Sequence, residues 1–163
     1  MDAFELLKSD HEKVAGILNK IEGTTERALK TREELFTQLK TELDIHAAIE
    51  EKIFYPVLEK AEESRDITLE AFEEHRLVKQ LLAELESGSK DDETWTAKFT
   101  VLKENIEHHV EEEEGEMFQM AEDQIPADTL QRLGSLMQGE KMKVMKMTTS
   151  SGRARRASAA GQR

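Results

Sequence analysis

Two stretches of the chain place a glutamate one helical turn after a histidine, at positions where a helix should present apolar residues to a core. These HxxxE motifs are His46 with Glu50 and His109 with Glu113. A single further histidine precedes each motif by about 35 residues. The chain therefore contains an approximate internal repeat, in which each half supplies one histidine and then one HxxxE motif.

The histidines and glutamates of this repeat suggest metal binding. The apolar stripes of the expected helices contain six of them, which are His11, His46, Glu50, His75, His109 and Glu113. A buried carboxylate without a partner is energetically costly, and a divalent cation between the side chains removes that cost. Imidazole with carboxylate suits iron, manganese or zinc, and two glutamates can bridge a metal pair about 3.5 to 4 Å apart. We predict that these six residues form a metal-binding centre.

The polar and aromatic residues beside the motifs are interpreted as surface or packing residues. His108 points about 100° away from the inward stripe, so we expect it on the surface or outside the ligand set. Glu114 is an alternative to Glu113 as a ligand if the helix near Gly115 is irregular. Tyr55 is interpreted as a packing residue, although its place one turn beyond the first motif also brings it within reach of the centre.

Four long helices must position these residues. Apolar residues spaced three and four apart predict helices over about residues 2–22, 31–63, 66–87 and 92–125. Thr31 and Glu34 are expected to form a capping box at the start of the second helix, and Pro56 predicts a kink or local opening inside it. Helices of this length joined by short turns favour an antiparallel up-and-down four-helix bundle in the all-α class.

Beyond the bundle, the sequence predicts two smaller parts. The bundle itself is assigned to residues 1–125, and a short amphipathic C-terminal helix to residues 126–147. Residues 148–163 lack apolar periodicity and are predicted to form a disordered basic tail. A solvated tail is the simplest interpretation, with weak contacts to acidic lipid, nucleic acid or an acidic neighbouring chain as the alternative.

Composition excludes several other kinds of protein. The 163 residues include no cysteine, which removes disulfides, thiolate zinc sites and iron–sulfur clusters. The net charge is −12, and residues 141–163 hold seven basic residues and no acidic one, so residues 1–140 are more acidic than the whole chain. This acidic body argues against nucleic acid as the main partner. We find no apolar run long enough for a signal peptide or a membrane span, and we expect a cytoplasmic location.

The repeat resembles the hemerythrin-like, or HHE cation-binding, family. The stretches "DHEKV", "HAAIEEKIFYPVL", "EEHRLVKQLLAEL" and "HHVEEEEGEMF" are similar to the four signature helices of that family. The resemblance covers residues 1 to about 125 and implies two non-haem iron ions bridged by an oxo or hydroxo group inside a four-helix bundle. In the implied ligand set, His11 and His46 hold one iron, His75 and His109 hold the other, and Glu50 and Glu113 bridge them.

One position departs from the oxygen-carrying members of that family. They have a fifth histidine one turn after the third-helix histidine, where this chain has Lys79. A lysine amine must lose a proton before it binds a metal, so water, hydroxide or another carboxylate is expected to complete the shell.

The function implied by the resemblance is binding of, or reaction with, a small diatomic molecule or peroxide. Dioxygen, peroxide and nitric oxide all remain candidates, in sensing, redox defence or iron handling, and we favour a binding or sensing role over catalysis. The alternative is a metal-free helical bundle with a structural or protein-interaction role. The sequence gives no indication of the oligomeric state.

Overall fold

A computed structural model describes the backbone of residues 1–160 and the side chains of residues 1–150. All regular elements in this range are helices, and two of them, η1 and η2, are π-helices. They are α1 (Ala3–Glu22), α2 (Leu29–Ile49), η1 (Glu50–Phe54), α3 (Tyr55–Glu59), α4 (Glu62–Ser87), α5 (Glu93–Glu112), η2 (Glu113–Met117), α6 (Phe118–Gln124) and α7 (Ala127–Ala160). The all-α prediction is confirmed.

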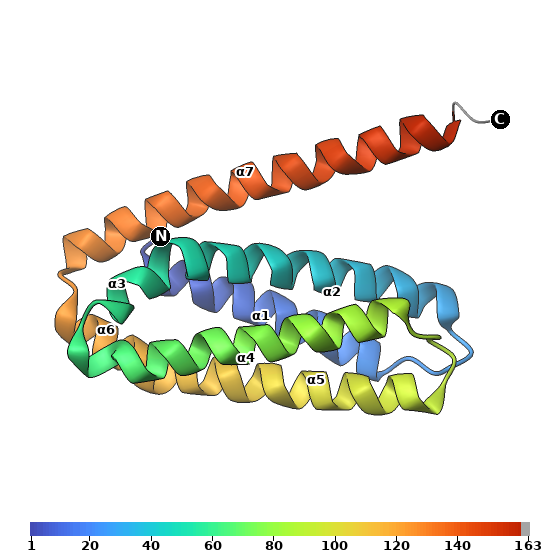
Figure 1. Cartoon of the computed structure of the whole chain (residues 1–163), viewed down its shortest axis with the longest axis horizontal. Helices are drawn as coiled ribbons and strands as arrows, with labels where there is room; N and C mark the ends of the chain where they lie inside the picture. Colours follow the sequence, from blue (N-terminus) through green and yellow to red (C-terminus); the bar gives the residue numbers. More distant parts are fainter. Residues whose placement is uncertain (161–163) are drawn as a thin grey trace.

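Four helical rods form the antiparallel bundle (Figure 1). The second rod is α2, η1 and α3 in continuous succession, and the fourth is α5, η2 and α6. α1 packs against α2, α4 packs against α5, and α7 lies along α1, α2 and η1. The two repeats therefore pair within themselves, and within residues 1–160 only the first pair is covered by a fifth helix.

Two helix starts differ from the sequence prediction. α2 begins at Leu29, after Ala28, and no side chain caps it. The expected capping box of Thr31 and Glu34 does not form, because Thr31 already lies in the first turn of the helix. α4 begins at Glu62, a turn before the predicted start, whereas α1 has a capping box between Asp2 and Glu5.

The irregularity expected near Pro56 is the π-helix η1, which begins at the motif glutamate. Pro56 has no N–H and its ring crowds the carbonyl one turn earlier, which disfavours a regular α-helix there. The N–H of Tyr55 instead donates to the carbonyl of Glu50, five residues back. η2 repeats this arrangement, since the N–H of Phe118 donates to the carbonyl of Glu113. Each motif thus passes into a π-helix at its glutamate.

Two apolar clusters fill the bundle, one toward each end. The cluster near α3 and α6 includes Leu7 and Phe54, and the cluster near the opposite loops includes Leu18 and Leu102. Along α1, the first cluster ends at Leu7 and the second begins at Val14. The polar residues of the repeat lie in the layer between them, so apolar packing on both sides fixes the height of that layer.

The fifth helix is longer than predicted. α7 has 34 residues and continues to Ala160, through most of the segment predicted as a disordered tail; residues 161–163 lie outside the described residues. Its packed part is short, with Leu130, Leu133 and Met137 buried. Lysine, arginine and alanine favour helix, so a helix nucleated by packing can continue through a segment that has no apolar periodicity.

A glycine lets α7 approach the start of α1. A Cβ on Gly134 would lie 2.7 Å from the carbonyl carbon of Asp2 and 2.9 Å from the nitrogen of Ala3. Any larger residue would push the two helices apart. The position of α7 on the bundle is therefore set by backbone packing as well as by side chains.

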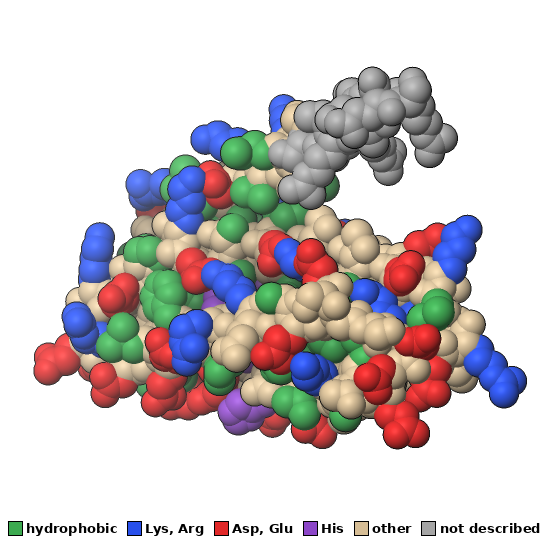
Figure 2. All heavy atoms as spheres, turned by 45° about the vertical axis from the view of Figure 1, so that its right-hand side comes forward, with side chains coloured by type: hydrophobic (Ala, Val, Ile, Leu, Met, Phe, Trp, Pro, Cys, Tyr) green, Lys and Arg blue, Asp and Glu red, His purple; other side chains and the backbone are tan. Residues whose placement is uncertain are grey.

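The surface carries the acidic character of the sequence. Figure 2 shows acidic side chains gathered along the lower side of the molecule, the part that α4 and α5 form in Figure 1. In residues 1–160, no helix is both long and apolar enough to cross a membrane.

Candidate metal centre

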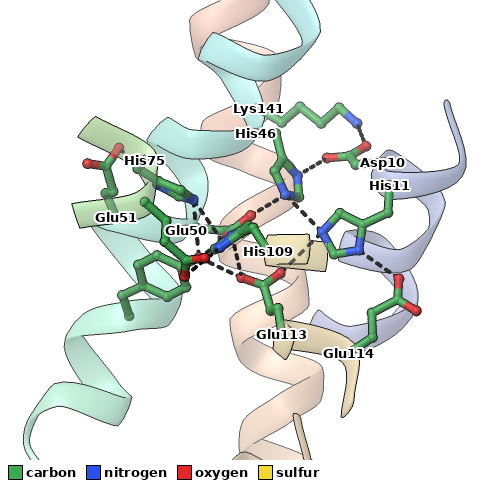
Figure 3. A network of polar contacts seen from close by, with 12 residues as sticks. Asp10, His11, His46, Glu50, Glu51, His75, His109, Glu113, Glu114 and Lys141 are labelled. Atoms are coloured by element: carbon green, nitrogen blue, oxygen red, sulfur yellow. Dashed lines mark hydrogen bonds and ion pairs between the residues drawn. The ribbon is translucent and has the colours of Figure 1, made fainter. Parts of the chain in front are cut away.

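The six residues predicted from the repeat come together in the middle of the bundle (Figure 3). They project from six different elements: His11 from α1, His46 from α2, Glu50 from η1, His75 from α4, His109 from α5 and Glu113 from η2. All six are buried, and the two glutamates are 0% and 2% exposed. The polar layer is therefore closed to bulk water around its two carboxylates.

His11 and His46 form one side of this layer, which we call the first half-site. Their Nε2 atoms face each other at 3.1 Å. Nε2 of His11 also lies 3.1 Å from Oε1 of Glu113, and Nε2 of His46 contacts Oε1 of Glu50. Two imidazoles and one oxygen from each glutamate thus converge on one point.

His75 and His109 form the other side, which we call the second half-site. Nε2 of His109 lies 3.3 Å from Oε2 of Glu113, and Nε2 of His75 lies 3.7 Å from Oε2 of Glu50. Each glutamate therefore turns one oxygen toward each half-site. This is the arrangement that two bridging carboxylates require.

Tyr55 completes the second half-site. Its hydroxyl lies 3.2 Å from Nε2 of both His75 and His109, and it donates to Oε2 of Glu113 at 2.5 Å. The side chain is fully buried. The interpretation of Tyr55 as a packing residue is therefore incomplete, because its polar end belongs to the centre.

The donor atoms fit a pair of metal ions. Both oxygens of Glu50 and Oε1 of Glu113 are buried without a hydrogen bond. Two ligand atoms that bind one ion at about 2.1 Å, with a right angle between the two bonds, are about 3 Å apart. The Nε2 atoms of His11 and His46 are separated by 3.1 Å, which agrees with this value. His11, His46, Glu50 and Glu113 can each offer one atom within 4.8 Å of the others, and so can Glu50, His75 and His109.

The electrostatics of the layer favour positive charge. Burial alone lowers the pKa of His46, but the charge of Glu50 and the hydrogen bond to Asp10 outweigh it and raise the pKa to about 10. Burial likewise lowers the pKa of His109, but hydrogen bonds to Glu113 and Glu74 raise it to about 11. Without other cations, the carboxylates thus draw protons onto His46 and His109, and a metal ion must compete with those protons.

Each of the four histidines also has a carboxylate beside its outer nitrogen, Nδ1. The pairs are His46 with Asp10 at 3.2 Å, His11 with Glu114 at 2.7 Å, His109 with Glu74 at 3.2 Å and His75 with Glu51 at 3.6 Å. The first three are within hydrogen-bond distance, and the fourth is longer. A carboxylate at Nδ1 holds the ring orientation and leaves Nε2 free to bind a metal.

In both halves of the repeat, each outer carboxylate pairs with a histidine that lies on a different helix. Asp10 precedes His11 in the sequence but pairs with His46 on α2. Glu74 likewise precedes His75 on α4 but pairs with His109 on α5. Glu51 and Glu114 each follow a motif glutamate and contact a histidine of the opposite half. The repeat therefore includes ten residues rather than six.

Sequence reasoning missed Asp10, Glu51 and Glu74 and considered Glu114 only as a replacement for Glu113. The signal was present, because an acidic residue stands next to each single histidine and next to each motif glutamate. In the structure Glu113 points inward and Glu114 pairs with His11 from outside.

Two residues beside the motifs lie outside the centre. The ammonium of Lys79 lies 2.8 Å and 3.1 Å from the two carboxylate oxygens of Glu51, and half of its side chain is exposed. His108 is exposed and lies 3.3 Å from Glu112, as the prediction of a surface position implies.

A small apolar cavity adjoins all four histidines. It offers about 40 Å³ of free space, and its apolar lining comes from Val14, Leu43, Ala47, Val78, Leu82, Ile106 and Val110. Asp44 and Lys79 also line it. A site for one water molecule needs at least about 10 to 15 Å³ of such space, so the cavity has room for a diatomic molecule but not for a large substrate.

Comparison with known proteins gives a family model, curated relatives and a solved structure that match this chain. The family model of the hemerythrin HHE cation binding domain matches residues 2–121. The uncharacterized protein Rv2633c of Mycobacterium tuberculosis is 33% identical over 132 residues, which are 79% of this chain and 73% of that protein. The crystal structure of a hemerythrin HHE cation binding domain-containing protein, the Rv2633c homolog from Mycobacterium kansasii, is similar with a TM-score of 0.82 and 28% identity, over 94% of this chain and 93% of that chain.

Proposed function

We propose a function from one premise, which is that the chain belongs to the hemerythrin HHE cation-binding domain family. The proposal is that its centre holds two non-haem iron ions and binds or reacts with dioxygen, peroxide or nitric oxide. The observation that carries it is the pair of buried glutamates, each of which turns one oxygen toward each half-site.

The proposed ligands follow from the donor atoms. His11 and His46 would hold one ion, His75 and His109 the other, and Glu50 and Glu113 would bridge the two. The resemblance to oxygen-carrying relatives leaves one ligand position open, because Lys79 replaces a histidine and pairs with Glu51 at the edge of the bundle. The Tyr55 hydroxyl lies beside the second half-site instead, 3.2 Å from Nε2 of both of its histidines.

Nitrogen and oxygen donors without sulfur are compatible with iron, manganese and zinc. We propose iron because the resemblance of the four signature helices implies a di-iron centre. When bound, two iron ions supply redox chemistry and positions that a small molecule can occupy.

The residues around the ions have three roles in this proposal. The outer carboxylates hold the imidazoles so that each Nε2 faces inward. Tyr55 holds a proton against Oε2 of Glu113, and burial together with the charges of both glutamates keeps its pKa well above the usual value. The apolar cavity keeps bulk water away and admits small uncharged molecules, a class that includes all three candidate ligands.

The first test is the metal content of protein produced with iron and purified without a chelator. We expect close to two iron ions per chain and near-ultraviolet absorption from the loaded centre. A folded, thermally stable protein without metal would contradict the proposal and favour the metal-free structural bundle. Stopped-flow mixing of the reduced protein with dioxygen, peroxide and nitric oxide would then separate reversible binding from turnover.

A further inference from the structure

We propose that Lys141 of α7 is a positioning residue for the first half-site, acting through Asp10 on His46. The inference rests on the proposed function, because it concerns how firmly the first half-site holds its ion. It gives α7 a part in the centre, although none of the six proposed ligands lies on that helix.

Three contacts connect α7 to the centre (Figure 3). The ammonium of Lys141 pairs with Oδ1 of Asp10. Oδ2 of the same carboxylate lies 3.2 Å from Nδ1 of His46. Nε2 of His46 then faces Nε2 of His11 and an oxygen of Glu50.

Asp10 differs from the other three outer carboxylates in its burial. Its side chain is 6% exposed, whereas those of Glu51, Glu74 and Glu114 are 25%, 26% and 35% exposed. Partly exposed carboxylates are solvated, but a buried carboxylate needs a charged partner. His46 cannot be that partner when it binds a metal, because the ligand form of imidazole is neutral. Lys141 supplies the missing positive charge.

The rest of α7 is anchored without Lys141. Leu130, Leu133 and Met137 are buried against the bundle, and Gly134 fits closely against the start of α1. Glu140, the neighbour of Lys141, pairs with Lys52 of η1 at 2.6 Å. Removing the Lys141 charge should therefore leave α7 in place and act on Asp10 alone.

The experiment compares variants of the full-length, iron-loaded protein. Lys141→Met should speed the release of one of the two ions to a chelator by about 3- to 10-fold, less than the 10- to 100-fold typical of losing a direct hydrogen-bond partner of a ligand. Lys141→Arg keeps the charge and should restore the slow rate. Glu140→Gln removes the neighbouring ion pair of the same helix and should leave both rates unchanged.

A second readout uses metal-free protein, so it does not depend on the proposed function. The Nδ1–H of His46, observed by NMR, should exchange with solvent faster in Lys141→Met than in the wild type or in Glu140→Gln, because Lys141 then no longer fixes the Asp10 carboxylate beside that nitrogen. Lys141→Gln, which keeps a polar side chain, replaces Lys141→Met if the latter fails to fold.

Two results would overturn the proposal. One is ion release and N–H exchange at wild-type rates in Lys141→Met, and the other is an equal effect of Glu140→Gln, which would make Lys141 only an anchor of α7. A wild-type protein without metal would instead refute the proposed function, and the exchange measurement would still decide whether Lys141 fixes His46.

Discussion

The two half-sites have the same ligand pattern but different surroundings. The first lies beneath α7, and its outer carboxylate Asp10 is buried. The second faces α4 and α5 with no described helix over it, and its outer carboxylates Glu51 and Glu74 are partly exposed. Equivalent positions of the repeat show the difference: the residue before the motif histidine is buried Ile45 in the first half and exposed His108 in the second.

The ligand motif is shared by the two half-sites, but closure from solvent is not. In the proposed centre the six inward residues would bind the cations, while the residues one position along each helix determine how far each half-site is closed off from solvent. We therefore expect the first half-site to retain its ion more firmly and the second to exchange with solvent and small ligands more readily.

The largest effect is expected from removing one histidine on either side. His46→Ala and His75→Ala each remove one of two imidazoles from a half-site, so the metal content should fall from about two to about one ion per chain. Elemental analysis with circular dichroism as a folding control measures this. Complete loss in both variants would show that the half-sites are not separable.

A smaller effect is expected from Tyr55→Phe, which alters the second half-site only. Loss of the hydroxyl should weaken metal binding there by roughly 10-fold and leave the first half-site unchanged. A metal titration that resolves two affinities measures this. A change in the tighter affinity alone would contradict the assignment of Tyr55 to the second half-site.

The pH dependence of stability should differ between metal-free and metal-loaded protein. In the metal-free protein, His46 and His109 have pKa values raised to about 10 and about 11. Their contribution to stability is complete below the unfolded pKa of about 6.5 and is lost as the pH rises through those values. The metal-free Tm should therefore fall from pH 6.5 to pH 10, whereas the loaded protein should lose its ions on acidification.

The smallest effect is expected from His108→Ala. His108 is exposed and lies outside the ligand set, so the metal content should stay unchanged and the unfolding free energy should change by less than about 0.5 kcal/mol. Elemental analysis and chemical denaturation measure the two quantities. A loss of metal would mean that His108 contributes to the second half-site from its exposed position.

The sequence predicted the bundle and its inward residues because both follow from helical periodicity. A histidine and a glutamate four apart share one face of a helix, so Glu50 and Glu113 could be assigned to the interior without knowledge of the fold. Asp10 and Glu74 could not, because each lies about 100° from the inward stripe of its own helix. Only the packing of neighbouring helices brings them against a histidine.

The irregular parts of the helices were predicted less completely. Pro56 indicated an opening in the second rod, and the region of Gly115 was considered for one in the fourth. Neither residue indicates that both π-helices begin at the motif glutamate. That start depends on the direction in which the packed helices must point their side chains. The extent of α7 was also missed, because periodicity reports which residues pack and not how far a helix continues beyond its contacts.

The exchange of carboxylates between the halves has a consequence for protein synthesis. His11 is near the start of the chain, but its outer partner Glu114 is made more than a hundred residues later. Lys141, the partner of Asp10, is made later still. The earliest residues of the centre are thus completed last. A chain cut short before α7 would retain all six proposed ligands but lack the Lys141 charge that we propose steadies the ion of the first half-site. Retention of that ion would then distinguish full-length chains from truncated ones.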